Sequence, residues 1–363
     1  MTHLNELYLI LNKSLKWNKS HLKCFALIML VIILKQTCNL SSASKALPIK
    51  CLPQSFYRRM QRFFAGQYFD YRQISQLIFN MFSFDQVQLT LDRTNWKWGK
   101  RNINILMLAI VYRGIAIPIL WTLLNKRGNS DTKERIALIQ RFIAIFGKDR
   151  IVNVFADREF IGEQWFTWLI EQDINFCIRV KKNFIVTNHL GKNHKISDLF
   201  RHLKVGQIEC RKRRILVGRV KLYISALQLE NGELLLVVSP QFNANAIQDY
   251  ALRWKIETLF SCLKGRGFNL ENTRLTDPRR VKKLIAVLAI SFCWCYLTGE
   301  WQHNQKKAIK IKKHGRLSMS LFRYGLDYVQ MAIQRLIGFG KKEEFKEILA
   351  ILRKQNPDRI RVL

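Results

Sequence analysis

One segment near residue 250 places side chains that could hold a metal cation and grip phosphates at helical spacing. The segment is AIQDYALRWKIETLFSCLKGRGFNLENTRL, residues 246–275, and the four side chains are Tyr250, Arg253, Glu257 and Lys264. At 100° per residue the four fall within an arc of about 60°, and the apolar residues of the segment fall on the opposite side. We predict one helix from Ile247 to Lys264 that presents a carboxylate flanked by two cations and a phenol. A solvated helix face carries the same residue types, so the spacing alone leaves both interpretations open.

Two earlier carboxylates favour the metal interpretation. Asp92 lies in an otherwise apolar strand pattern, where an ionised group is costly unless it is paired or bound to a metal. Asp157 follows a short apolar strand, at the kind of position where active-site residues of α/β sheets gather. With Glu257, these carboxylates could hold two divalent ions about 4 Å apart, an arrangement that cleaves phosphodiesters. Oxygen ligands favour Mg²⁺ or Mn²⁺ over zinc, and none of the eight cysteines forms a CxxC pair.

A basic helix is predicted near the N-terminus. In SFYRRMQRFF, residues 55–64, the aromatic residues and Met60 cluster on one side of a helix. Arg58, Arg59 and Arg62 lie on the other side, which is the pattern of the second helix of a helix-turn-helix that contacts DNA. An ordinary amphipathic helix with a solvated basic face has the same pattern.

The elements that would position these residues change from helices to strands at Val87. We predict strands at 87–92, 103–112, 115–123, 151–156 and 175–180, and helices from Ser130 or Asp131 to Phe146 and from Gly162 to Gln172. The order β-β-β-α-β-α-β is that of an RNase H-like core. Residues from 181 to about 240 interrupt it with strand patterns around an Asn231-Gly232 turn, which predicts an inserted β-subdomain.

The predicted fold is therefore an α/β fold, with an RNase H-like catalytic core that carries the β-insertion and is flanked by helical regions. We assign residues 1–85 to a helical DNA-binding region and 86–300 to the catalytic domain. Residues 301–363 form a basic helical C-terminal region, whose stretch from Leu317 to Ile337 is a candidate for dimerisation.

The charge of the chain predicts a polyanionic partner. Lys and Arg number 61 against 26 Asp and Glu, a formal net charge of +35, in a chain that is 48% hydrophobic and therefore of globular composition. The apolar runs at 25–34 and 284–297 are too short to span a bilayer. We expect nucleic acid as the partner and no membrane.

At these motifs the sequence resembles the DDE transposases of bacterial insertion sequences, specifically the group with a Y-R-E-K signature. The matching blocks are LTLDRTNW around Asp92, FADREF around Asp157 and the long block around Glu257. The SFYRRMQRFF helix and the KKHGR and SLFRYGL segments also look like the family, so the resemblance covers roughly residues 40–330.

The resemblance implies cut-and-paste DNA transposition in the bacterial cytoplasm, at the nucleoid. Asp92, Asp157 and Glu257 would be the catalytic metal ligands for Mg²⁺ or Mn²⁺. Tyr250, Arg253 and Lys264 would hold phosphates beside the cleaved end, and Arg158 is a further phosphate candidate. The partners would be double-stranded DNA, as terminal inverted repeats and target, and a second copy of the chain in a synaptic homodimer.

One departure from the family concerns the insertion. Members that form hairpin ends commonly stack a flipped base on a tryptophan there, but no Trp occurs between Trp168 and Trp254. Tyr223 or Phe242 could replace it, because stacking needs only an aromatic face. Two alternative functions stay open: an RNase H-like DNA nuclease without strand transfer, and an inactive or domesticated sequence-specific DNA-binding protein.

Overall fold

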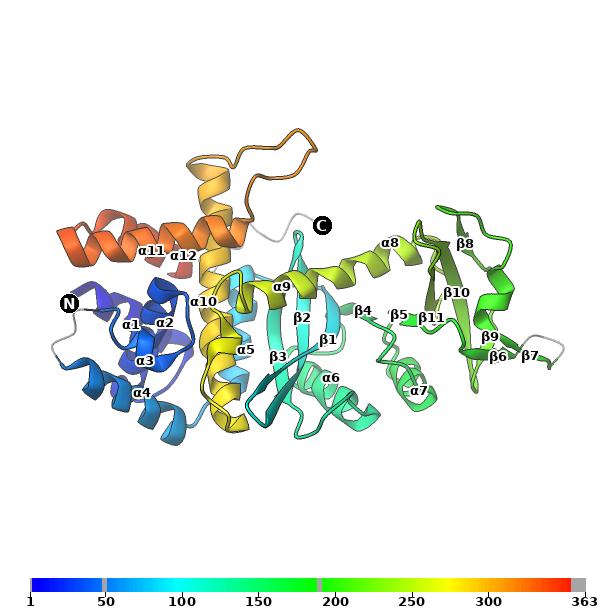
Figure 1. The fold of residues 1–363 in the computed structure, drawn as a ribbon, viewed down its shortest axis with the longest axis horizontal. Coiled ribbons are helices and arrows are strands. Elements are labelled where there is room, and N and C mark those ends of the chain that lie inside the picture. Colours follow the sequence, from blue (N-terminus) through cyan, green and yellow to red (C-terminus); the bar gives the residue numbers. More distant parts are fainter. Residues whose placement is uncertain (1, 48–50, 188–190, 354–363) are drawn as a thin grey trace. The chain divides into compact units, whose positions relative to one another are not determined.

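The chain divides into two units, and the structure, a computed structural model, describes residues 2–47, 51–187 and 191–353 (Figure 1). The first unit comprises Met1–Phe84, Trp96–Ile103 and Phe260–Leu363. The second comprises Asp85–Asn95 and Asn104–Leu259.

The second unit is built on a central sheet that contains the five predicted strands. Strands β3 (Ile115–Leu123), β2 (Arg101–Tyr112), β1 (Val87–Trp98), β4 (Ile151–Ala156) and β5 (Phe176–Val180) are neighbours in that sequence. β2 and β3 are antiparallel, whereas β1, β4 and β5 are parallel. The predicted α/β fold with a central sheet is thus confirmed.

The parallel pairing of β1 with β4 determines where two of the candidate residues lie. Leu91 of β1 is in register with Ala156, the last residue of β4. Asp92 and Asp157 are the next residues of the two strands. Because parallel strands run in the same direction, these two aspartates lie next to each other where the pairing of β1 and β4 ends.

Two helices accompany the sheet as predicted. α6 (Thr132–Phe146) begins with a capping box in which Asp131 and Glu134 each accept the backbone N–H of the other, and it ends at Gly147. α7 (Glu163–Glu171) follows β4. α6 packs against β3 and α7 within the unit.

The insertion continues the central sheet. Its short strands are β6 (Ile185–Thr187), β7 (Asn193–Lys195), β8 (Ile208–Cys210), β9 (Ile215–Val217), β10 (Val220–Gln228) and β11 (Leu234–Ser239), with a 3₁₀ turn at Ile196–Phe200. β11 pairs antiparallel with β5, so the hairpin of β10 and β11 extends the core sheet.

The segment from Ile247 to Lys264 is helical as predicted, but the regular α-helical spacing predicted along it is wrong. The structure has α8 (Ala246–Ala251), a 3₁₀ turn at Leu252–Trp254 and α9 (Lys255–Leu263). A 3₁₀ turn has about 3.0 residues per turn instead of 3.6, so the angular spacing of one regular helix does not hold across it. Tyr250 and Arg253, expected on the exposed face, are buried at 2% and 3% exposure.

The first unit is a helical assembly around α10 (Pro278–Gln305), which is buried from Leu284 to Glu300. Its other elements are α1 (Thr2–Ser14), α2 (Lys19–Lys35), α3 (Leu40–Ala43), α4 (Pro53–Gly66), α5 (Tyr71–Phe82), α11 (Leu321–Phe339), α12 (Glu343–Arg353) and a 3₁₀ turn at Leu270–Asn272. α10 contacts α2, α4, α5, α11 and α12. The apolar face of α11, within the stretch considered for dimerisation, packs against α10, so the exposed residues of α11 remain for any partner.

By length and composition, α10 could cross a membrane, but 89% of its apolar window is buried inside the protein. The pair α1 and α2 passes the same test only if counted as one span, and it is bent by 113°. A core helix can have the length and composition of a membrane span, and the burial of α10 inside the first unit is that of a core helix.

Two glycines set the closest approach of α10 and α11. A Cβ at Gly325 would overlap the carbonyl oxygen of Cys295, and one at Gly299 would overlap that of Leu321. Overpacking of this kind typically costs 1–3 kcal/mol, and backbone leaves little room to adjust. We expect Gly325→Ala to lower the free energy of unfolding by about 3 kcal/mol in urea denaturation.

Gly338 is the matched control on the same helix, because nothing lies within 4 Å of a Cβ added there. Gly338→Ala should be neutral or stabilising by up to about 1 kcal/mol, since Ala is the better helix former. Equal free energies of unfolding for Gly325→Ala and Gly338→Ala would contradict a close approach of α10 and α11 at Gly325.

Candidate active site

The structure brings the three predicted carboxylates into one unit with a shared set of partners. Asp92 lies in β1, Asp157 directly follows β4, and Glu257 lies in the first turn of α9. The side chain of Asp92 is 15% exposed, whereas that of Glu257 is 43% exposed. The site is therefore a buried carboxylate at the sheet end with a more open one on the helix.

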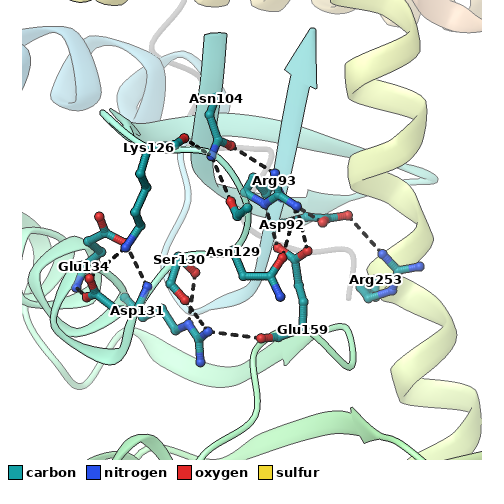
Figure 2. A network of polar contacts seen from close by, with 12 residues as sticks. Asp92, Arg93, Asn104, Lys126, Asn129, Ser130, Asp131, Glu134, Glu159 and Arg253 are labelled. Atoms are coloured by element: carbon teal, nitrogen blue, oxygen red, sulfur yellow. Dashed lines mark hydrogen bonds and ion pairs between the residues drawn. The ribbon is translucent and has the colours of Figure 1, made fainter. Parts of the chain in front are cut away.

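Arg253 joins two of these carboxylates. Its Nη1 donates to Oδ2 of Asp92 at 3.0 Å and its Nη2 donates to Oε1 of Glu257 at 2.8 Å. Figure 2 shows the first of these contacts, with Arg253 reaching from its helical segment to Asp92. Its Nε has no hydrogen-bond partner within the described part of the chain. One donor of a buried guanidinium therefore remains for a further acceptor.

The electrostatics around Asp92 favour a bound cation. Burial raises the pKa of Asp92 to about 7, while Arg253 and the backbone N–H of Arg93 lower it and the charges of Glu159 and Asp157 raise it. Burial alone would lower the pKa of Arg253, but the Tyr250 phenol and Asp92 outweigh that effect, so its pKa is raised. The guanidinium thus stays charged beside a desolvated carboxylate.

Tyr250 connects the third carboxylate to the same cluster. Its hydroxyl donates to Oδ1 of Asp157 at 3.3 Å, and the ring centroid lies 5.8 Å from the Arg253 guanidinium. Burial raises the pKa of Tyr250, so the phenol keeps its proton and acts as a hydrogen-bond donor. Tyr250, Arg253 and the three carboxylates therefore form one connected group.

Arg158 and Lys264 form ion pairs with glutamates outside this group. Arg158 donates its backbone N–H to Asp157, while its guanidinium pairs with Glu233 at 3.4 Å, and Arg179 contacts the same Glu233. Lys264 belongs to the first unit, where its Nζ pairs with Glu271 at 2.7 Å and lies 5.9 Å from the Trp96 ring centroid.

A second polar network, which was not predicted from the sequence, adjoins Asp92 (Figure 2). Arg93, next to Asp92, makes a two-point contact with Glu159, two residues after Asp157, with both distances at 3.1 Å. Arg93 also donates to Asn104 and Asn129. The signal was present in the sequence, because both aspartates are followed by an arginine and one of these blocks also carries a glutamate.

Arg135 of α6 completes this network. It is 4% exposed, and it donates to the hydroxyl of Ser130 and to the backbone carbonyls of Glu159 and Ile161. Its guanidinium also lies 5.3 Å from the Phe160 ring centroid. The side chain of Arg135 thus holds the loop after Asp157 in place by hydrogen bonds to the backbone carbonyls of that loop.

The predicted basic helix is α4, in the first unit. Its aromatic side is buried, and Arg58 and Arg62 are exposed. Arg59 is partly buried and donates to the carbonyl of Ser20 in α2 at 3.2 Å, so it supports helix packing as well as the basic face. The arginines of α4 and the carboxylates belong to different units.

The aromatic candidates of the insertion lie together. The rings of Tyr223 and Phe242 are 5.8 Å apart at an interplanar angle of 69°, and Phe242 is 44% exposed. Arg214 lies over the Tyr223 ring at 5.2 Å. An aromatic face and a cation are therefore present in the insertion without a tryptophan.

The donor chemistry of the site fits a hard divalent cation. Asp92, Asp157 and Glu257 offer only carboxylate oxygens, and the buried Asp92 requires a compensating positive charge. Arg253 supplies that charge in this structure. Among the described residues, no group of three or more His, Cys, Asp and Glu side chains is already assembled around a metal position.

Comparisons with known proteins identify the family of the chain. No curated protein matches the chain. Among solved structures, the cryo-EM structure of a piggyBac transposase synaptic complex with hairpin DNA is similar at a TM-score of 0.46 and 12% identity, over 98% of this chain and 84% of that one. The sequence profile of the transposase DDE domain family matches residues 83–294, more than half of the chain. The chain therefore belongs to the transposase DDE domain family.

Proposed function

We propose that this transposase cuts DNA at the ends of its element and joins the freed ends to target DNA, as a cut-and-paste enzyme of the Y-R-E-K group of bacterial insertion sequences. The observation that carries the proposal is the connected group at the sheet end. Arg253 bonds Asp92 and Glu257, and Tyr250 bonds Asp157. Each of the three candidate metal ligands is thereby hydrogen-bonded to a side chain that can bind phosphate, either the Arg253 guanidinium or the Tyr250 hydroxyl.

Asp92, Asp157 and Glu257 would hold Mg²⁺ or Mn²⁺. When bound, such ions lower the pKa of an attacking water or hydroxyl and stabilise the leaving oxygen of a phosphodiester. In the first step an oxygen of water bonds to phosphorus and the bond from phosphorus to the 3′ oxygen breaks, leaving a 3′-OH. In the joining step the oxygen of that 3′-OH bonds to the phosphorus of a target phosphodiester, the bond from that phosphorus to the target's 3′ oxygen breaks, and the target strand is left with a 3′-OH that takes up the proton lost by the attacking hydroxyl.

Arg253 and Tyr250 would hold the DNA phosphate between these two steps. Arg253 has an unpartnered Nε within the described residues, and arginine binds phosphate through two parallel N–H donors. Tyr250 keeps its hydroxyl proton, so the hydroxyl can donate a hydrogen bond to a phosphate oxygen. The guanidinium would exchange carboxylate contacts for phosphate contacts as the carboxylates take up the cation.

Double-stranded DNA is the proposed partner, as terminal inverted repeats and as target. The net charge of +35 supports a polyanion, and the exposed Arg58 and Arg62 of α4 support recognition of the ends. Two ends must be held for joining, which supports a homodimer in the synaptic complex. If the ends pass through a hairpin, Tyr223 and Phe242 would offer the stacking face.

Substitution of Lys264 distinguishes the proposed transposase from a nuclease that cuts DNA without joining it. Its ion-pair partner Glu271 has a side chain that is 46% exposed, so Lys264→Ala should leave the fold intact. We expect the variant to nick element ends at nearly the wild-type rate. Joining should fall about tenfold to a hundredfold, the loss of one charge-assisted hydrogen bond to phosphate.

The assay is a time course with labelled DNA from the flanks of the gene, Mg²⁺ and a target plasmid. Lys255→Ala, which removes a lysine of α9 outside the signature, is the matched control and should join like the wild type. Nicking of unrelated duplexes without any joined product would show a nuclease without strand transfer. Binding of the ends without cleavage would show an inactive DNA-binding protein.

A further inference from the structure

A basic groove of about 460 Å³ lies in the first unit, whereas the three carboxylates belong to the second unit. It runs between the end of α4 with the following loop and the first turns of α10. Four cations line it: Arg279, Arg280, Lys282 and Lys283. Asp277 is the one acidic residue among the lining residues, and it is engaged as the N-cap of α10. The groove therefore has a clear excess of positive charge.

Aromatic rings accompany these cations. Lys282 lies 4.3 Å from the Tyr71 ring centroid, and Lys283 lies 5.8 Å from that of Phe69 and donates to the carbonyl of Phe64 at 2.9 Å. Tyr68, in contrast, is 80% exposed. The two lysines are held in place by these contacts, while the Tyr68 ring offers an open face beside them.

The cations of the groove repel one another. Burial lowers the pKa of Lys283, and the charges of Arg279 and Arg280 lower it further against the opposing effect of Asp277. An anion in the groove would relieve this repulsion. The electrostatics thus agree with the geometry in favouring a negatively charged ligand.

A second groove of about 500 Å³ adjoins the first. Gly66 and Gln67 line both, and the second groove is also lined by Arg59 and Arg62 of α4. The basic surface therefore continues from α10 to the helix expected to contact DNA. This continuity makes DNA the ligand favoured over a small anion.

We propose that the groove binds a single strand of DNA, with phosphates on the α10 cations and a base stacked on Tyr68. A basic groove with an open aromatic ring is the arrangement of single-strand binding sites, because every base has a face that can stack. A paired base in a duplex has both faces covered by its neighbours, so the open ring fits an unpaired strand. This inference rests on the proposed function in that DNA is the substrate of the protein.

Fluorescence anisotropy with labelled oligothymidine, the full chain and no divalent metal tests the groove. Tyr68→Ala should weaken binding about tenfold or more, the effect of losing one stacked base, and Tyr68→Phe should bind like the wild type. Arg280→Ala should weaken binding and reduce the slope of log affinity against log salt by about 0.7, one phosphate contact. Lys346→Ala, an exposed lysine of α12, is the charge-matched control and should leave the slope unchanged.

Three outcomes would overturn the inference. One is Tyr68→Ala binding oligothymidine as tightly as the wild type. Another is an equal loss for Tyr68→Ala on oligothymidine and on a duplex of the same length, which would indicate a duplex site without stacking. The third is an effect of Lys346→Ala as large as that of Arg280→Ala. Failure of the proposed function is distinguishable, because the wild type would then neither cut nor join its element ends, whatever the groove variants do.

Discussion

Asp157→Asn is expected to lower Mg²⁺-dependent cleavage of element ends by at least about a thousandfold, because a metal site contributes several kcal/mol to the transition state and each 1.36 kcal/mol is a factor of ten. The substitution keeps the size of the side chain, and Asn can still accept the hydroxyl hydrogen bond of Tyr250. Binding of the same DNA in gel shifts should be unchanged or tighter, because one carboxylate no longer repels the phosphates.

Asp149→Asn provides the matched control for this substitution. Asp149 is an exposed aspartate two residues before β4, outside the connected group. Its variant should cleave like the wild type. Strong Mg²⁺-dependent cleavage by Asp157→Asn would remove Asp157 from the metal ligands.

Glu159→Gln should cost about 3 kcal/mol of unfolding free energy, the lower end of the range for removing one partner of a buried ion pair. The side chains of Arg93 and Glu159 are 14% and 23% exposed, so removal of the carboxylate leaves the Arg93 charge largely shielded from water. Urea denaturation at neutral pH measures the change. Because Arg93 adjoins Asp92 and Glu159 follows Asp157, we also expect slower cleavage at unchanged DNA affinity.

Asp85→Asn is the control for the ion-pair experiment. The pair of Asp85 with Arg150 lies in the same unit, with side chains that are 73% and 40% exposed. Pairs of this kind contribute less than about 1 kcal/mol, so this variant should retain nearly all of its stability. An equal loss in the two variants would show that the Arg93–Glu159 contact has no special structural role.

The strands of the core could be predicted because their signals are local. The bounds of β3 and β4 agree with the apolar runs, and Arg113-Gly114 marks the turn before β3. The capping box of Asp131 and Glu134 likewise marks the start of α6 within four residues. Turn chemistry and capping operate between near neighbours in sequence, which is why they can be read from it.

The burial of Arg253 could not be predicted in this way. Helical periodicity assigns charged residues to the exposed face, but Arg253 bonds Asp92, which is 161 residues earlier in the chain. Tertiary pairing of this kind overrides the periodicity, and the helix is interrupted by a 3₁₀ turn at that point. The pair of Arg93 and Glu159, 66 residues apart, was missed for the same reason.

The candidate carboxylates could be proposed from the sequence because each lies at a recognisable structural position. Asp92 and Asp157 follow residues that are paired in the parallel register of β1 and β4. Glu257 opens a helix, four residues after the arginine that contacts it. Spacing and strand order were therefore sufficient to propose the carboxylates as a set, whereas their polar partners required the folded chain.

Iron-directed cleavage of the protein backbone tests most directly whether Asp92, Asp157 and Glu257 together form one site for divalent cations. Fe²⁺ bound in place of Mg²⁺ at such a site would, with ascorbate and peroxide, generate radicals that cut the nearby backbone. We predict fragments ending close to all three residues, suppressed by excess Mg²⁺ and lost in Asp157→Asn but not in Asp149→Asn. Cuts confined to other parts of the chain, or cuts that Mg²⁺ does not suppress, would contradict a shared metal site.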